Sequence, residues 1–298
     1  MPRPFADEDL DAAVAFLARQ HARHREAEPL LPAGPDFRGA VEELWHEPGA
    51  SGAVSVSGYL LGATVDDPVW GPNVWVQLAG HAVDDPEGAR DLYALAAQRW
   101  VDEGNTRHYV IVPAHDAALL DAWYRVGFGQ QHAVGLREVP AEAAWPEGAR
   151  PARPEDEDAL VALAPVLSDH QAQAPVFGPG RVGWDEADLR RKIVEDTEAG
   201  DIFIAERDGS TVGAVYLAER DADLHRPQCA FLAWAAVVPE ARGGGVGIAL
   251  TDAALAWARS RGYDILAADW RVTNLLASRF WPARGFRTTH LRLYRSIP

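Results

Sequence analysis

Apolar residues recur along this chain with two different periods, which predicts an alternation of strands and helices. The run from Cys229 to Val238 carries no charged residue, as is typical of a buried strand. Ile248–Ser260 is rich in alanine and predicts a helix, and Ile265–Trp270 predicts the next strand. Near the start of the chain, Ala6–Arg25 predicts an amphipathic helix. This alternation predicts the α/β (α+β) class, with mixed twisted sheets flanked by helices.

The remaining elements follow from the same patterns and from the turn residues between them. Further strands are predicted at Ala53–Val65, Val74–Val83 and Arg107–Val112, and further helices at Pro86–Glu103, Asp116–Val126, Pro154–Leu167 and Trp184–Glu198. Asp201–Arg207 and Thr211–Glu219 predict a hairpin, and Ser168–Gly183 predicts a long loop because proline and glycine interrupt it.

The second half of the chain repeats the pattern of the first. Trp123-Tyr-Arg-Val-Gly-Phe128 parallels Trp281-Pro-Ala-Arg-Gly-Phe286, with Asp116 and Asn274 as the helix caps ahead of them. Arg3-Pro4 parallels Arg153-Pro154. Matches in one order predict a tandem duplication. The sequence thus predicts a first domain at residues 1–139, a linker at residues 140–150 and a second domain at residues 151–298.

A glycine-rich turn follows the strand Cys229–Val238. Pro239 ends the strand, and four glycines follow Arg242 before the next helix. Such a turn binds anions, because glycine lets the backbone approach closely and the helix start presents free amides. A P-loop needs Gly-Lys-Ser/Thr, but the sole lysine is Lys192, and the G-x-G-x-x-G fingerprint fails in both registers. The turn therefore predicts a pyrophosphate site of another kind.

The pattern Arg-x-x-Gly-x-Gly, present at Arg242, Gly245 and Gly247, resembles the acetyl-CoA loop of the GNAT (Gcn5-related) N-acetyltransferase family. The segment from Asn274 to Phe286 is similar to the segment that follows in this family. The resemblance implies two tandem GNAT-like domains and acetyl-CoA as co-substrate, held in the second domain. The cofactor-binding residues that it implies are Ala235, Ala236, Val237, Arg242, Gly243, Gly244, Gly245, Val246, Gly247, Ile248 and Asn274.

The resemblance also implies a general base at Asp269, five residues before Asn274. Asp269 equally fits a structural role, either in an ion pair with Arg271 or Arg279 or as a cap of the loop to Asn274. The tyrosine that acts as acid in the family is replaced by Trp281, whose indole is too weak an acid to protonate a thiolate. Ser278, Tyr294 or water would then supply the proton, or the thiolate leaves unassisted, or catalysis is weak.

Residues for the acceptor are expected in the long loop, where the family builds its acceptor pocket. The candidates in this loop are His170, Gln171 and Gln173. Further candidates are Asp221, Asp223 and His225 in the polar connection before the strand Cys229–Val238, and Trp234 within that strand. A solvated or core-packing role is the alternative for each. His21 and His24 have helical spacing suited to a metal pair, but their arginine neighbours favour a solvated face, and no metal site is predicted.

The first half departs from the family in its loop, which reads Asp84-Asp-Pro-Glu-Gly-Ala-Arg90. Three carboxylates at a helix start cap that helix themselves and repel a pyrophosphate. The first half is therefore expected to be degenerate and not to bind CoA. Its expected roles are to complete the acceptor pocket or to act as a built-in dimer partner, so that the chain is a monomeric pseudo-dimer or a homodimer.

Composition narrows the function further. The 298 residues are 48% hydrophobic and 24% charged, as in soluble globular proteins, and no run reaches the length of a membrane span. The net charge of −16 argues against nucleic-acid binding and suits a cationic amine substrate. One cysteine excludes an intrachain disulfide, and no export signal is visible, so a cytoplasmic location is expected.

The sequence favours an N-acetyltransferase that transfers an acetyl group from acetyl-CoA to an amine, most simply that of a small molecule. The alternative is a non-catalytic acyl-CoA-binding sensor or regulatory protein, which the missing tyrosine and the acid-free strand Cys229–Val238 favour. A third hypothesis, an interaction module that binds no CoA, also stays open.

Overall fold

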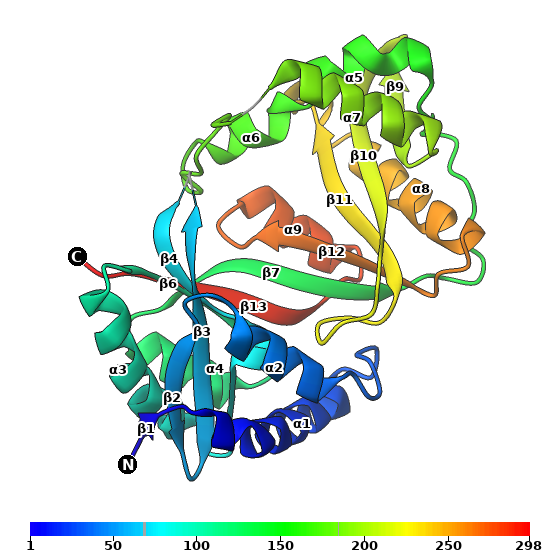
Figure 1. Cartoon of the computed structure of the whole chain (residues 1–298). Coiled ribbons are helices and arrows are strands. Elements are labelled where there is room, and N and C mark those ends of the chain that lie inside the picture. The colour runs from blue at the N-terminus through cyan, green and yellow to red at the C-terminus, as the bar shows by residue number, and fades with distance from the viewer. Residues whose placement is uncertain (68–69, 184) are drawn as a thin grey trace. The chain divides into compact units, whose positions relative to one another are not determined.

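A computed structural model describes residues 1–67, 70–183 and 185–298 of the chain. These residues form two compact units. Unit 1 comprises Met1–Val134, Ala222–Pro227 and Thr288–Pro298, and unit 2 comprises Gly135–Asp221 and Gln228–Arg287 (Figure 1). Each unit is a mixed sheet with helices packed against it, which confirms the predicted fold class.

Unit 1 contains most elements of the first half of the chain. Its helices are α1 (Leu10–Ala27), α2 (Phe37–His46), α3 (Pro86–Asp102) and α4 (Ala117–Arg125), with short 3-10 turns η1 (Asp7–Asp9) and η2 (Leu78–Gly80). Its strands are β1 (Arg3–Pro4), β2 (Ser51–Ser55), β3 (Gly58–Asp67), β4 (Gly71–Val76), β5 (His81–Val83), β6 (Arg107–Pro113) and most of β13 (Arg287–Ser296).

Unit 2 contains the elements that follow. Its helices are α5 (Glu157–Leu163), α6 (Pro165–Gln171), α7 (Glu186–Glu198), α8 (Val246–Ser260) and α9 (Leu275–Ala283), with 3-10 turns η3 (Pro154–Asp156) and η4 (Pro239–Ala241). Its strands are β8 (Arg150–Pro151), β9 (Ile202–Arg207), β10 (Ser210–Arg220), β11 (Cys229–Val237), β12 (Ile265–Arg271) and the second part of β7 (Gly129–Glu138).

The strand order in unit 1 is β1-β2-β3-β4-β6-β13, and β5 pairs with β3. Side chains alternate across β3, so Leu61 packs with Leu17 of α1 and Val41 of α2. Gly62 faces the other way, where the buried ring of Trp100 from α3 leaves no room for a Cβ atom. Helices therefore cover both faces of this sheet.

The last strand of unit 1 comes from the end of the chain. β13 pairs antiparallel with β6, from His290 opposite Pro113 to Ser296 opposite Arg107. The last strand of the first half, β7, continues instead into unit 2, where its residues from Gly135 onward lie and where β7 neighbours β12. The two halves thus exchange their final strands, and the bounds of the compact units differ from a division at the predicted linker of residues 140–150.

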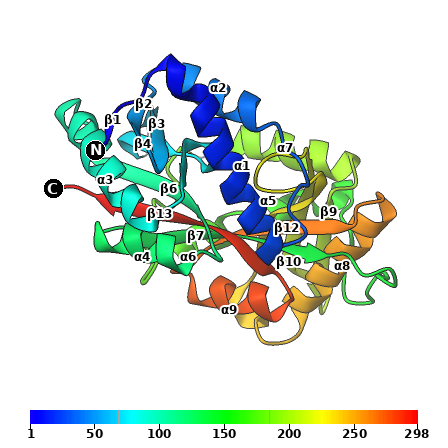
Figure 2. The same cartoon turned by 90° about the horizontal axis from the view of Figure 1, so that it is seen from below.

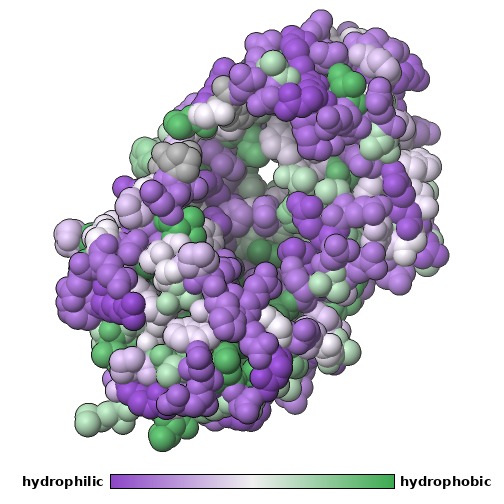
Figure 3. Space-filling model, in the orientation of Figure 1, coloured by the Kyte–Doolittle hydropathy of each residue, from purple (hydrophilic) through white to green (hydrophobic). Residues whose placement is uncertain are grey.

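The strand order in unit 2 is β7-β12-β11-β10-β9-β8. Helices α5 and α7 lie on one side of these strands and α8 and α9 on the other (Figure 2). Leu160, Leu163, Ile193 and Ile204 form the core under α5 and α7, and the face that these helices present to the viewer is mostly hydrophilic (Figure 3). Among the described residues, no helix is both long and apolar enough to cross a membrane.

Both halves begin with the same ion pair. Arg3 of β1 contacts Asp9 at 2.6 Å, and Asp9 also accepts a hydrogen bond from the Ala6 backbone. Arg150 of β8 contacts Asp156 at 2.8 Å, again six residues further along, and Asp156 accepts from the Arg153 backbone. The repeat is therefore aligned at Arg150-Pro151. Aligning Arg3-Pro4 with Arg153-Pro154 was wrong by three residues, because the sequence hides which arginine reaches the aspartate.

Several predicted elements have different bounds in the structure. The predicted strand 53–65 is the hairpin of β2 and β3, and 74–83 is divided by η2 into β4 and β5. The helix expected at 6–25 begins with η1 and continues as α1, and the one at 154–167 is η3, α5 and α6, so that α6 takes up the start of the predicted long loop. The helix predicted from Trp184 is α7; Trp184 itself lies outside the described residues.

The predicted solvated face at His21 and His24 was wrong, since both side chains are buried in unit 1. His24 stacks on His115 and meets His290 edge-on, each at 4.7 Å between ring centroids. Burial lowers the pKa of His24 to about 3, and it lowers the pKa of His290 well below its usual value. Burial thus holds these imidazoles neutral. Among the described residues, no group of side chains has a metal-binding arrangement.

This histidine cluster predicts an acid-sensitive fold. The unfolded chain binds a proton at His24 below pH 6.5 and the folded chain does not until about pH 3, so stability falls as the pH drops through that window. His24 alone accounts for a loss on the order of 2 kcal/mol at pH 5. Urea unfolding at about pH 7.5, 6 and 5 measures this loss of stability. The His24→Leu variant should show a flatter dependence on pH, and an equal slope in both proteins would contradict this origin.

Candidate active site

The strands β11 and β12 pair over only part of their length. They are parallel from Ala230 opposite Leu266 to Leu232 opposite Ala268. β11 then runs on to Val237 and β12 to Arg271, and no further pairing joins them within the described residues. A shift in register against β10 leaves Ala233 as a bulge at the point where pairing stops. The edges of β11 and β12 beyond this point thus lack a strand partner on the facing side.

The backbone of β11 alternates in direction beyond the bulge. Val238 donates its N–H to the carbonyl of Val212 in β10 at 2.9 Å. Alternation therefore turns the backbone groups of Ala236 toward β10 and those of Ala235 and Val237 toward the unpaired edge. The carbonyl of Val237 accepts a hydrogen bond from Arg242 Nε at 3.1 Å. Of the strand residues predicted for cofactor binding, Ala235 turns its N–H and carbonyl toward this edge, and Val237 turns its N–H there beside a carbonyl that Arg242 already contacts.

The glycine turn joins β11 to α8 as predicted. Gly243 and Gly245 have left-handed φ angles of 76° and 85°, which other residues rarely adopt, and Gly245 is the N-cap of α8. The Ile248 and Ala249 amides already donate to the Gly245 carbonyl at 3.0 Å. Among the described residues, the backbone amides from Gly243 to Gly247 have no acceptor outside their own helix. These amides and the helix dipole form a binding site for an anion.

Two glycines of the turn have close neighbours on other elements. A Cβ atom at Gly247 would lie 3.2 Å from the Phe280 ring of α9, so the first turn of α8 packs tightly on α9. A Cβ atom at Gly244 would lie 2.3 Å from Nη2 of Arg207, which donates to the Gly244 carbonyl at 3.3 Å. Arg207 was not among the predicted residues. It ends β9, and only the pairing of β9 with β10 brings it to the turn.

Asp269 lies directly after the last residue of β12 that pairs with β11, and it is exposed. The neighbouring residues Ala268 and Trp270 are buried, so Asp269 is the position of this strand end that faces solvent. A carboxylate at the point where β11 and β12 part is placed to accept a proton from a group that enters between the strands.

Asn274 is buried and holds the start of α9. Its Oδ1 accepts from the Leu276 and Ala277 amides at 3.1 and 3.3 Å, which confirms the predicted cap. His170 Nε2 of α6 is 3.3 Å from the same oxygen, and Gln171 accepts from Arg271 Nε at 3.1 Å. The structure thus brings the predicted acceptor residues His170 and Gln171 to the end of β12. Gln173 is exposed further along the loop.

We expect Asn274→Ala and Asn274→Asp to separate the two roles of this side chain. Alanine removes the cap and should lower the free energy of unfolding by about 1–2 kcal/mol. Aspartate retains the capping oxygen and should lower the free energy of unfolding by less than alanine does. It lacks the amide donor that the cofactor arm is expected to use, so the affinity for acetyl-CoA should fall. Urea denaturation and acetyl-CoA titration of both variants measure this. Equal stability of the two variants would contradict the capping role.

Comparison with known proteins identifies the family to which this chain belongs. The model of the acetyltransferase (GNAT) family matches residues 165–286. The aminoglycoside N(6')-acetyltransferases type 1 of Klebsiella aerogenes and Stenotrophomonas maltophilia are 37% and 32% identical over 133 and 148 residues. These matches cover 44% and 47% of this chain and 79% and 97% of those proteins. The chain belongs to the GNAT family of acetyltransferases.

Two further similarities extend beyond the matched segment. A mycothiol acetyltransferase of Thermobispora bispora is 35% identical over 192 residues, or 58% of this chain and 60% of that protein. A GCN5-related N-acetyltransferase from Sphaerobacter thermophilus has a TM-score of 0.61 at 16% identity and covers 99% of this chain and 95% of that one. At this identity the likeness shows a shared fold, and it extends the GNAT fold over nearly the whole chain.

The position expected for the acid of the family is occupied by a packing residue. Trp281 is 9% exposed, and its ring meets Phe280 and Phe286 edge-on at 4.9 and 5.4 Å. Of the substitutes considered from the sequence, Ser278 lies on α9 in unit 2, whereas Tyr294 belongs to unit 1 and packs on Tyr109 at 5.0 Å.

The other acceptor candidates fall in both units. Trp234 of β11 packs beside Tyr216 in unit 2, and Asp221 ends that part of unit 2. Asp223 and His225 belong to unit 1, where Asp223 pairs with Arg226 at 2.8 Å and His225 meets the His290 ring at 5.1 Å. The latter two therefore have structural partners within unit 1.

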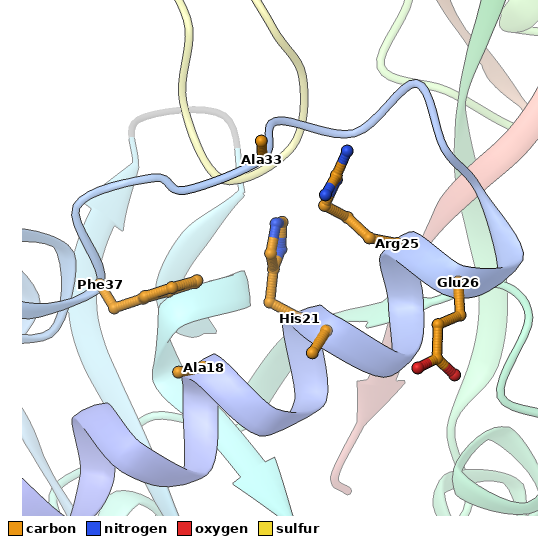
Figure 4. A pocket seen from close by; sticks show the side chains of 7 residues that line it. Ala18, His21, Arg25, Glu26, Ala33 and Phe37 are labelled. Carbon is orange, nitrogen blue, oxygen red and sulfur yellow. The ribbon is translucent and has the colours of Figure 1, made fainter.

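Unit 1 also contains a separate cavity of about 420 Å³ beside α1 (Figure 4). His21, Arg25 and Phe37 line it together with three alanines and Glu26. His21 Nε2 is 2.8 Å from the Pro32 carbonyl, and Arg25 Nε donates to the Leu31 carbonyl at 2.9 Å. These side chains thus hold the loop after α1, and the cavity includes no residue of the glycine turn.

The strand of unit 1 that corresponds to the end of β11 is β5, and its edge is already occupied. Gln20 and Arg23 of α1 donate to the carbonyls of His81 and Val83 at 3.0 and 3.1 Å. The His81 ring reaches across to the Ile111 carbonyl of β6 at 2.8 Å. Asp85 caps α3 by accepting from the Glu87 amide. Side chains of α1 thus occupy the backbone carbonyls of His81 and Val83.

Proposed function

We propose that this protein is an N-acetyltransferase that uses acetyl-CoA and acetylates the amine of a small molecule, with the cofactor bound in unit 2. The observation that carries the proposal is the glycine turn at the start of α8, where the amides of Gly243–Gly247 have no acceptor outside α8 among the described residues. The glycine turn comes directly after the strand edge formed by Ala235 and Val237. The residues present therefore fit a ligand that has both a pyrophosphate and an amide-containing arm.

In this proposal each residue has a distinct task. The turn amides bind the pyrophosphate with Arg242 beside them, and the edge of β11 pairs with the arm like an added strand. Acetyl-CoA supplies an acetyl group activated as a thioester. Asp269 takes the proton of the acceptor ammonium, which makes the nitrogen nucleophilic. Asn274 holds α9 against the end of β12 and directs its amide donor to the cofactor arm.

The acceptor class follows from the relatives and from charge. The curated relatives are named for aminoglycosides and for mycothiol. The net charge of −16 favours the approach of a cationic amine. Trp234, next to the bulge of β11, offers an apolar wall for the body of such a molecule. We therefore propose an amine borne on a polar small molecule as the acceptor.

Release of the CoA thiol tests this function. Purified protein, acetyl-CoA and a panel of amines that includes aminoglycosides should give thiol release with at least one acceptor, and mass spectrometry should show the acetylated amine. Bound acetyl-CoA without turnover of any amine would instead support the second candidate.

That second candidate is an acyl-CoA-binding sensor, and a specific observation favours it. Trp281 occupies the position of the acid and is packed between two phenylalanine rings, so no proton donor of tyrosine type stands there. β11 also carries no acidic side chain. A sensor would retain the glycine turn and bind CoA while lacking turnover.

A further inference from the structure

Arg207 lies at the glycine turn although it is distant in sequence. Its Nη2 donates to the Gly244 carbonyl at 3.3 Å, and the guanidinium occupies the space that a side chain at Gly244 would fill. The side chain comes from the end of β9, beside the tight turn at Asp208 and Gly209, which have φ angles of 52° and 76°. The hairpin thus fixes the backbone from which Arg207 extends.

The charge of Arg207 is not neutralised by any acidic side chain that the structure describes. Within the described part of the chain, no carboxylate lies within ion-pair distance of this guanidinium. The adjacent Glu206 is held by Arg150, with contacts of 2.9 and 3.0 Å. In a protein of net charge −16, most other exposed arginines of unit 2 have an acidic partner, as Arg181, Arg190 and Arg261 do. An exposed cation next to unpaired amides forms a concentrated positive site.

We propose that Arg207 is a further cofactor-binding residue, whose guanidinium binds a phosphate group of CoA together with the amides of the glycine turn. This rests on the function proposed above. Guanidinium binds phosphate with paired, charge-assisted hydrogen bonds. In the described part of the chain, Nη2 of Arg207 has a hydrogen-bond partner and the other N–H groups of the guanidinium have none, so they are available to a phosphate. CoA offers two such groups, the pyrophosphate and the 3'-phosphate.

Calorimetric titration of acetyl-CoA into the wild type, Arg207→Gln and Arg220→Gln tests this proposal. Arg220 is a matched control, because it is also exposed and lies on the same hairpin, but it pairs with Cys229 at the opposite end of β11. We expect Arg207→Gln to weaken binding roughly tenfold and to reduce its dependence on salt, since one phosphate contact is lost. Arg220→Gln should bind as the wild type does.

Titration with the 3'-dephospho form of acetyl-CoA identifies the phosphate. If Arg207 binds the 3'-phosphate, the wild type should bind this ligand about tenfold more weakly than acetyl-CoA, and Arg207→Gln should bind both ligands with the same reduced affinity. If Arg207 binds the pyrophosphate, Arg207→Gln should lower the affinity for both ligands by the same factor. Wild-type affinity in Arg207→Gln would overturn the proposal while leaving acetyl-CoA binding intact. Absence of binding by the wild type would overturn the proposed function as well, and so the two failures are distinct.

Discussion

Gly245→Glu is expected to abolish measurable binding of acetyl-CoA, with an affinity at least roughly 100-fold weaker than that of the wild type. Gly245 caps α8 with a left-handed φ of 85°, which costs a residue with a side chain about 1–2 kcal/mol. The new carboxylate would also compete for the amides of the turn and repel a pyrophosphate. Calorimetric titration of the variant measures the loss.

Gly262→Glu is the matched control for this substitution. Gly262 follows the other end of α8, has a left-handed φ of 80° and has open space around its Cβ position, as Gly245 does. The control therefore carries the same backbone strain and the same charge, yet it should leave the affinity for acetyl-CoA within about twofold. Equal loss in both variants would show that the effect comes from destabilised folding, and retained affinity in Gly245→Glu would contradict the site.

Asp269→Asn is expected to lower kcat by roughly 100-fold or more and to leave the affinity for acetyl-CoA unchanged. The amide is similar in size to the carboxylate but cannot accept the proton of an ammonium. Because Asp269 lies where β11 and β12 part, its loss should act on the acceptor and not on the cofactor. Steady-state kinetics with a reactive amine measures the effect on kcat, and acetyl-CoA titration measures the effect on cofactor affinity.

Asp264→Asn is the control for the base. Asp264 is exposed just before β12 and lies at 3.8 Å from Arg259, so its substitution changes the net charge equally. Its kcat should stay near that of the wild type. If Asp269→Asn also retained kcat within about threefold, water or another residue would be the base, and a structural role for Asp269 would be favoured.

The local features of the site could be predicted from the sequence because each depends on neighbours in the chain. The glycine turn, the start of α8 and the cap at Asn274 follow from residue types that have few alternatives: left-handed glycines, an apolar helix and an amide before a helix start. The hairpin at Asp208 and Gly209 follows from its turn residues in the same way.

Features that depend on tertiary contacts could not be predicted. β7 and β13 have equivalent patterns, so hydrophobic alternation fits either strand in either unit, and only the structure shows β13 beside β6. The polar, arginine-flanked sequence around His21 and His24 indicated a solvated surface, because the packing of His115, His225 and His290 is not visible from the sequence. Arg207 has no local signal, since its neighbour Gly244 lies on another element.

Native mass spectrometry of the wild type counts the acetyl-CoA molecules bound per chain. We expect one, held in unit 2, because side chains of α1 occupy the edge of β5 in unit 1. Two would contradict the closed edge of unit 1. None at saturating acetyl-CoA would contradict the cofactor site at the glycine turn, and with it the proposal that this GNAT protein transfers acetyl groups from CoA.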